Sequence, residues 1–119
     1  MRTVLLGLAI AAPMALSALP AQAQGDAAAS TAIARGDFTR AERDLLAELR
    51  IHPDRPELLL NLAAVYSRTG RQAEARGLYE KVLAQSEVLM DLDADRTAGS
   101  HAIARIGLRR LATMRTASN

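Results

Sequence analysis

The chain has 119 residues, with 15 Lys and Arg residues, 13 Asp and Glu residues and no cysteine. This length allows one small domain, and the near-neutral charge argues against a nucleic-acid binder. The lack of cysteine excludes a disulfide framework and a lipoprotein-type anchor. Packing of apolar side chains must therefore hold the fold together.

Residues 1–23 are predicted to be a signal peptide. Arg2 supplies a positive start, an uncharged apolar run follows, and "AQA" is a small-x-small cleavage signal. The run is interrupted by Pro13 and is shorter than the roughly 20 residues that a membrane-spanning helix needs. We therefore expect cleavage between Ala23 and Gln24, export to the periplasm and no membrane attachment afterwards.

Residues 24–86 are expected to form a helical region whose first segment is the least defined. The Ala-rich "QGDAAAS" that starts at Gln24 is compatible with a flexible N-terminus or with the first turns of a helix that ends near Arg35. The next helix is clearer, since Asp37 can cap it. Its apolar residues recur at helical spacing: Phe38, Ala41, Leu45 and Leu49.

Two further helices follow a proline-rich break, "HPDRPE". Asp54 and Glu57 have the spacing of a capping box, and the helix from Glu57 to Arg68 is apolar around most of its circumference, as a central helix would be. After Gly70 the fourth helix carries one apolar stripe: Ala75, Leu78, Tyr79 and Val82. Arg76 and Glu80 have the spacing of a weak ion pair.

The remainder of the chain departs from this pattern. Residues 87–99 are expected to be a connecting loop or a short β-hairpin near 88–98, because apolar residues alternate there and "DADR" has turn chemistry. Residues 100–119 are expected to form a C-terminal capping helix, which Ser100 can cap, and a frayed tail. The residues expected to face inward are Ile103, Ile106 or Gly107, and Leu111.

A period of 34 residues joins the first two helical pairs. Gly36 and Gly70 stand 34 residues apart, and the same offset joins Ala41 to Ala75. A helix-turn-helix unit with this period and with small residues at fixed places resembles the tetratricopeptide repeat family over about residues 25–85. The second unit carries the resemblance best, and the first helix of the earlier unit is degenerate.

The resemblance implies an all-α fold: a short solenoid of about two repeats with a C-terminal capping helix. In such a unit the small residues lie where the two helices approach closely, and larger residues fill the space beside them. The positions that match this packing are Gly36, Ala41, Leu45, Leu59, Leu62, Ala63, Tyr66, Gly70, Ala75, Tyr79 and Val82. An αα-hairpin bundle with accidental spacing is the alternative.

No residue pattern predicts catalysis, a metal site or a cofactor. Asp91, Asp93 and Asp95 alternate as in a calcium loop, but the loop's glycine and closing glutamate are missing, so a solvated acidic turn is favoured. His52 and His101 lack metal-ligand spacing. The chain has no nucleophile motif and no phosphate-binding glycine loop. We therefore expect a protein that is not an enzyme.

Three arginines, Arg105, Arg109 and Arg110, form a basic face on the last predicted helix. This pattern is typical of a solvated face that the helix dipole favours, and an acidic docking surface is the alternative. The asparagine of the family's carboxylate clamp is matched by Asn61, but the clamp's other positions are not matched. We therefore do not expect binding of a chaperone tail.

The resemblance implies a protein-protein interaction module for a protein or peptide partner. The inner helices of such repeats line a concave face, and one face of the third predicted helix is free of the packing residues. The candidate partner-binding residues on it are Glu57, Leu60, Asn61, Ala64, Ser67 and Arg68. The alternatives are that Leu60 and Ala64 belong to the core, or that another copy of the chain completes the short array as a homo-oligomer.

Overall fold

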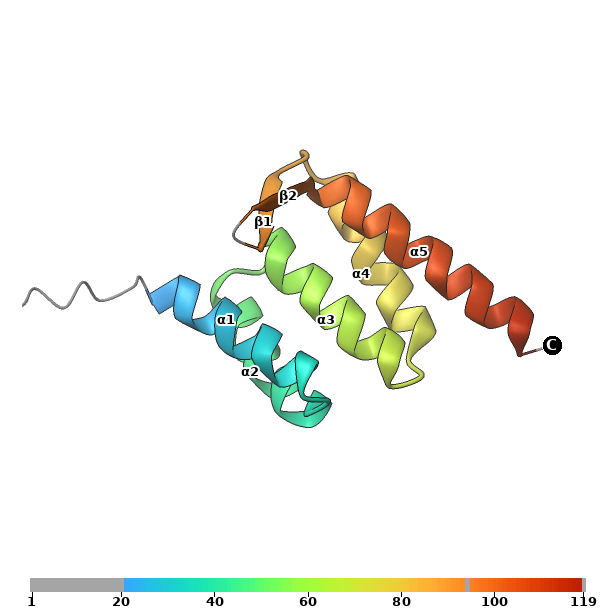
Figure 1. Cartoon of the computed structure of the whole chain (residues 1–119), viewed down its shortest axis with the longest axis horizontal. Coiled ribbons are helices and arrows are strands. Elements are labelled where there is room, and N and C mark those ends of the chain that lie inside the picture. The colour runs from blue at the N-terminus through green and yellow to red at the C-terminus, as the bar shows by residue number, and fades with distance from the viewer. Residues whose placement is uncertain (1–20, 94, 119) are drawn as a thin grey trace, which may run out of the picture.

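A computed structural model describes residues 21–93 and 95–118, and it contains five helices and one hairpin in those ranges. Figure 1 shows them in chain order. The helices are α1 (Ala21–Ala34), α2 (Phe38–Ile51), α3 (Pro56–Arg68), α4 (Gln72–Ala84) and α5 (Ser100–Ala117). The strands β1 (Leu89–Asp93) and β2 (Arg96–Gly99) lie between α4 and α5. Most of the predicted signal peptide lies outside the described residues.

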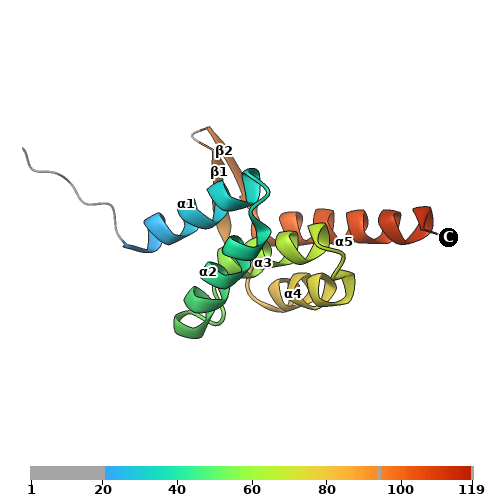
Figure 2. The same ribbon diagram turned by 90° about the horizontal axis from the view of Figure 1, so that it is seen from below.

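Helix α3 is the centre of the domain. Each helix packs on the next along the chain, and α3 also contacts α1 and α5. The odd-numbered helices therefore form one row, and α2 and α4 lie along the other side of it (Figure 2). Seven of the thirteen residues of α3 are buried. The expected all-α fold, a short helical repeat array with a C-terminal helix, is confirmed.

The two helix-turn-helix joints share the same backbone device. Gly36 and Gly70 have φ angles of 77° and 78°, a region that side chains disfavour, so glycine reverses the chain there at low cost. The Asp37 carboxylate then accepts a hydrogen bond from the Arg40 N–H at 3.2 Å and caps α2, as expected. At the other joint the Thr69 hydroxyl donates to the Val65 carbonyl at 2.9 Å.

A single apolar core runs through all five helices. Its fully buried members are small at the closest helix approaches and large beside them. The core consists of Ala29, Ala32, Ala41, Leu45, Leu58, Leu59, Leu60, Leu62, Ala63, Val65, Tyr66, Ala75, Tyr79, Val82, Ala104 and Leu111. Because Ala29 and Ala32 of α1 are buried, the Ala-rich segment forms a helix that packs on the domain.

The expected hairpin is present and is held to α5 by a buried serine. Strands β1 and β2 pair antiparallel, with Met90 opposite Ala98. The Ser100 hydroxyl accepts a hydrogen bond from the Val88 N–H at 3.0 Å, and the Ser100 N–H donates to the Val88 carbonyl at 2.8 Å. Gly99 holds the cap position of α5, so the prediction that Ser100 caps this helix is wrong. Its hydroxyl instead bonds the backbone of Val88, the residue before β1.

Two other predicted polar contacts are not made. Arg55 holds the cap position of α3, and its guanidinium has no acceptor with which to cap the helix. The Asp54 carboxylate lies 3.3 Å from Lys81, and Glu57 lies 3.7 Å from Arg55. The capping box predicted for Asp54 and Glu57 is therefore absent. Within the described chain Arg76 makes no ion pair with a carboxylate at the i+4 position.

Candidate functional site

The strongest candidate site is a groove between α3, α5 and the hairpin, with a volume of about 320 Å³. Most of its lining side chains are apolar, and the polar ones stand among them. The residues that line the groove are Leu60, Asn61, Ala64, Tyr79, Met90, Leu92, Ile103, Ile106, Gly107 and Arg110. Four separate elements therefore contribute to one surface, which we call the α3–α5 groove.

A close approach of α4 and α5 forms the inner wall of this groove. Gly107 of α5 lies against the ring of Tyr79, and a Cβ at residue 107 would come within 3.0 Å of three ring atoms. Glycine thus lets the two helices meet at this point. Burial raises the pKa of the Tyr79 hydroxyl, and the nearby guanidinium groups of Arg110 and Arg68 partly oppose this shift. Arg110 brings a positive charge to the lining of the groove.

Three of the six predicted partner-binding residues line the groove. Leu60 is only 6% exposed and forms part of the core as well, while Asn61 and Ala64 are half-buried. The structure does not bring the other three to this surface. Glu57 is half-buried beside Arg55, Ser67 is half-buried, and Arg68 is exposed at the end of α3.

The outer wall of the groove was missed by the sequence reasoning. Leu92 is 48% exposed on β1 and Ile106 is 41% exposed on α5. Of the two alternatives expected to face inward, Ile106 or Gly107, Gly107 is the buried one. The alternation of Met90 and Leu92 did indicate one apolar strand face. Nothing in the sequence indicated that this face and α5 would lie beside α3.

The predicted packing positions occupy the core and the turns. Gly36 and Gly70 form the two helix-turn-helix joints. The other nine are buried: Ala41, Leu45, Leu59, Leu62, Ala63, Tyr66, Ala75, Tyr79 and Val82. These side chains are therefore occupied in holding the helices together and are not available to a partner, apart from Tyr79 at the groove wall.

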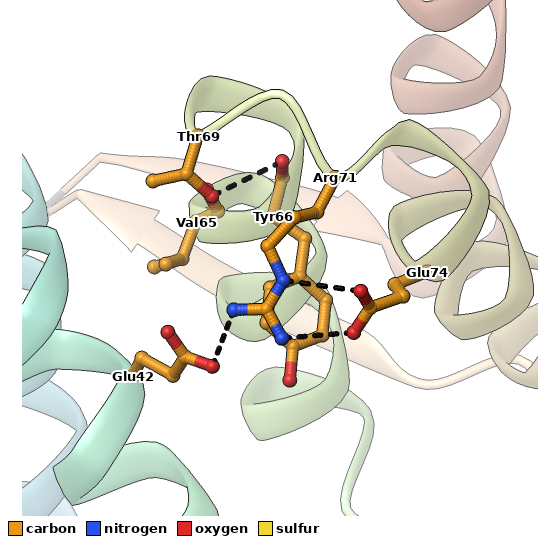
Figure 3. Close-up of polar contacts among 6 residues, drawn as sticks. All are labelled: Glu42, Val65, Tyr66, Thr69, Arg71 and Glu74. Carbon is orange, nitrogen blue, oxygen red and sulfur yellow. Dashed lines mark hydrogen bonds and ion pairs between the residues drawn. The ribbon is translucent and has the colours of Figure 1, made fainter.

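A polar cluster around Arg71 joins the two repeats (Figure 3). The Arg71 guanidinium lies 3.9 Å from the centre of the Tyr66 ring, contacts Glu42 of α2 at 2.6 Å, and makes two hydrogen bonds to Glu74 at 2.9 and 3.1 Å. The hydrogen bonds to Glu74 and Glu42 raise the pKa of Arg71, and that of Glu74 is lowered by Arg71. Arg71 thus contacts side chains from α2, α3 and α4, and the cluster is a structural tie between these helices.

The described residues offer no metal-binding cluster of three or more His, Asp or Glu side chains. Asp91 and Asp95 are exposed, and the Asp93 side chain lies outside the described residues. The His101 ring nitrogen lies 2.7 Å from the Gln85 carbonyl oxygen, which links the start of α5 to the end of α4. Among the described helices, none is long and apolar enough to cross a membrane.

Comparison with known proteins supports the repeat assignment. A family model described as tetratricopeptide repeat matches residues 32–87, which span the end of α1 through α4. No curated protein and no solved structure matches the chain. The match begins at the buried Ala32 and includes both glycine joints and the buried alanines of α2, α3 and α4. Residues 32–87 therefore match the tetratricopeptide repeat family, which supports the resemblance drawn from their 34-residue period.

Proposed function

We propose that this protein is a non-enzymatic module that binds a protein or peptide partner in the α3–α5 groove. The observation that carries the proposal is the pair of exposed apolar side chains, Leu92 and Ile106, which face an open hollow whose buried wall includes Leu60. Apolar side chains left around a concave surface gain free energy when a partner covers them. The family assignment adds support, because repeat arrays offer extended concave surfaces to protein partners.

The groove has the chemistry to hold and orient a peptide. Its apolar walls accept one or two apolar side chains of the partner. Asn61 offers an amide that can both donate and accept hydrogen bonds, and Arg110 offers a guanidinium that favours carboxylates. A partner with an apolar side chain next to an acidic group would therefore match both the apolar walls of the groove and its polar residues, Asn61 and Arg110.

No chemical step is proposed. The described side chains form no arrangement of nucleophile and base, and the Arg71–Glu42 ion pair joins α2 to the start of α4. The function of the groove is binding alone, with no cofactor and no nucleic acid.

We also propose that the protein works outside the cytoplasm, in the periplasm. The charged start at Arg2, the apolar run and the "AQA" signal support this proposal. Cleavage between Ala23 and Gln24 would shorten α1, which begins at Ala21, by less than one turn, and would leave the buried Ala29 and Ala32 in place. Intact-mass measurement of the exported protein should give Gln24 as the first residue, and retention of Met1 would refute this location.

Site-specific photo-crosslinking in cells tests the groove. A photoreactive phenylalanine analogue at Leu92 or Ile106 should form covalent adducts with a distinct partner. The same analogue at Leu46, an α2 residue with 43% exposure, should not. The proposal would be refuted if the yield of adducts from Leu46 equalled that from Leu92 or Ile106, or if the two groove positions gave no adducts.

Self-association of the chain is the alternative function. In that case the adducts from Leu92 would have the mass of two copies, and light scattering would give a dimer of the purified protein. The exposed apolar side chains serve either function, so the mass of the adduct decides between them.

A further inference from the structure

A second apolar surface runs along the last three turns of α5. It is made of Ile106, Arg109, Arg110, Thr113, Met114 and Ala117, which surround a hollow of about 450 Å³. These residues recur at intervals of three and four, so they form one straight stripe on the helix. We call it the α5 stripe, and within the described residues no other element lines its hollow.

The stripe is flanked by arginines that have no acidic partner in the described structure. Helix α5 contains Arg105, Arg109, Arg110 and Arg115 and not one Asp or Glu, and all four arginines are exposed. None of them takes part in an ion pair among the described residues, whereas Arg71 binds two carboxylates. The stripe thus combines uncovered apolar area with uncompensated positive charge.

We propose that the α5 stripe is the docking surface for an acidic amphipathic helix of a partner protein. The apolar side of that helix would cover Ile106 and Met114, and carboxylates on its flanks would lie against Arg109 and Arg110. A straight stripe three turns long matches the ridge of a second helix. Charge complementarity favours this partner and speeds its encounter with α5.

The same charges argue against a second copy of the chain as the occupant. Pairing of two α5 helices would bring the exposed arginines of both copies into an interface to which α5 contributes no acidic residue, which is unfavourable. Helix α1, at the other end of the array, has a single acidic residue, Asp26, to offer. A head-to-tail contact would therefore leave most of the α5 arginines without partners.

A lipid surface fits less well than a helix. Interfacial helices insert large residues such as Trp, Phe and Leu, whereas this stripe offers one Ile, one Met and one Ala. The arginines alone would give only a salt-sensitive attraction to anionic lipids.

This inference rests on the proposed binding function, because Ile106 and Arg110 belong to both surfaces. The two surfaces also have residues of their own. Leu92 lines only the groove, and Met114 lines only the stripe. Variants at these two positions therefore separate the two ideas.

The test uses a defined probe and the purified chain. The probe is a labelled peptide of roughly 18 residues, long enough to form a helix, with leucines on one face and glutamates elsewhere. A second peptide has lysines in place of the glutamates. Fluorescence anisotropy should show saturable binding of the acidic peptide that weakens as salt is added, and no binding of the basic one.

Variants of α5 locate the binding surface. Met114→Ser and the double reversal R109E/R110E should each weaken binding of the acidic peptide by about tenfold, since surface ion pairs and small apolar contacts are each modest. The matched control is R35E/R50E, which changes net charge equally at exposed arginines of other elements. This control should bind the peptide as the unmodified chain does. Loss of binding with Leu92→Ser but not with Met114→Ser would place the peptide in the α3–α5 groove and overturn the inference.

Each other outcome overturns the inference. If the acidic peptide does not bind, α5 is not a docking surface for such a helix. If R35E/R50E weakens binding as much as R109E/R110E does, the peptide responds to net charge alone and not to α5. Binding to vesicles of anionic phospholipid that is lost in R109E/R110E, without peptide binding, means that a membrane is the occupant. If the purified protein is a dimer that Met114→Ser dissociates, a second copy of the chain is the occupant of the α5 stripe. If these results appear while Leu92 still cross-links to a partner, the proposed function stands and only the α5 docking surface is lost.

Discussion

Replacing Gly107 with alanine should destabilise the protein, although alanine is the better helix former. Gly107 is buried in α5, and the added Cβ would lie within 3.0 Å of three atoms of the Tyr79 ring. That side chain is only 6% exposed and belongs to the apolar core. The substitution therefore forces α4 and α5 apart at the inner wall of the groove.

The magnitude follows from two opposing terms. In a helix interior alanine is favoured over glycine by about 1 kcal/mol, whereas overpacking of a filled core costs about 1–3 kcal/mol. Gly77 of α4 isolates the first term, because it is exposed and a Cβ there would meet nothing within 4 Å. We expect Gly77→Ala to be stabilising and Gly107→Ala to be less stable than it by about 1–3 kcal/mol.

Urea titration followed by circular dichroism measures this difference, and thermal melts give a second reading of about 4–8 °C per kcal/mol for a domain of this size. The same two substitutions should be measured in a Tyr79→Leu background. The ring is absent there, so the difference in stability between Gly77→Ala and Gly107→Ala should disappear. If Gly107→Ala stabilises as much as Gly77→Ala does, α4 and α5 do not meet as described.

Three further predictions concern the packing of the repeats and the ties between elements. Ala75→Leu should cost about 1–3 kcal/mol in urea titrations because Ala75 is fully buried, whereas Ala84→Leu at an exposed site should stay within about 0.5 kcal/mol. Arg71 lowers the pKa of Glu74 below its ordinary 4.5, so this contribution to stability is present above that pH and is lost as pH falls through the lower, folded-state value. Glu74→Gln should thus lower the melting temperature at pH 7, and this difference should shrink as the pH is lowered below 4.5. Ser100→Ala should cost about 1 kcal/mol in the same titrations, because the Val88 N–H loses its acceptor, and an unchanged midpoint would show that water replaces the hydroxyl.

The repeat core could be predicted from the sequence because its signals are local. The spacing of Gly36 and Gly70 marks two chain reversals, and an alanine such as Ala41 or Ala75 marks each close helix approach. Short-range periodicity is enough to specify such a unit, since each helix pairs with the next one along the chain. The same locality allowed the hairpin to be expected near residues 88–98.

The groove could be predicted only in part, because it depends on contacts between distant segments. The sequence placed Leu60, Asn61 and Ala64 on one face of α3 but did not show what lies across from them. The structure places α5 and β1 there, so that Leu60 is buried while Leu92 and Ile106 remain exposed. No spacing rule connects β1 to α3, and this part of the site required the three-dimensional arrangement.

The hairpin explains why the groove has two walls. Ser100 binds the Val88 backbone through two hydrogen bonds, and His101 lies at hydrogen-bond distance from the Gln85 carbonyl, so the start of α5 is fastened to the segment that precedes the inserted strands. With α5 fixed against α4 and α3, the inserted β1 stands beside the beginning of α3 (Figure 1). A direct connection from α4 to α5 would leave the α3 face open on that side. The inserted strands thus turn one face of a short repeat array into a bounded groove.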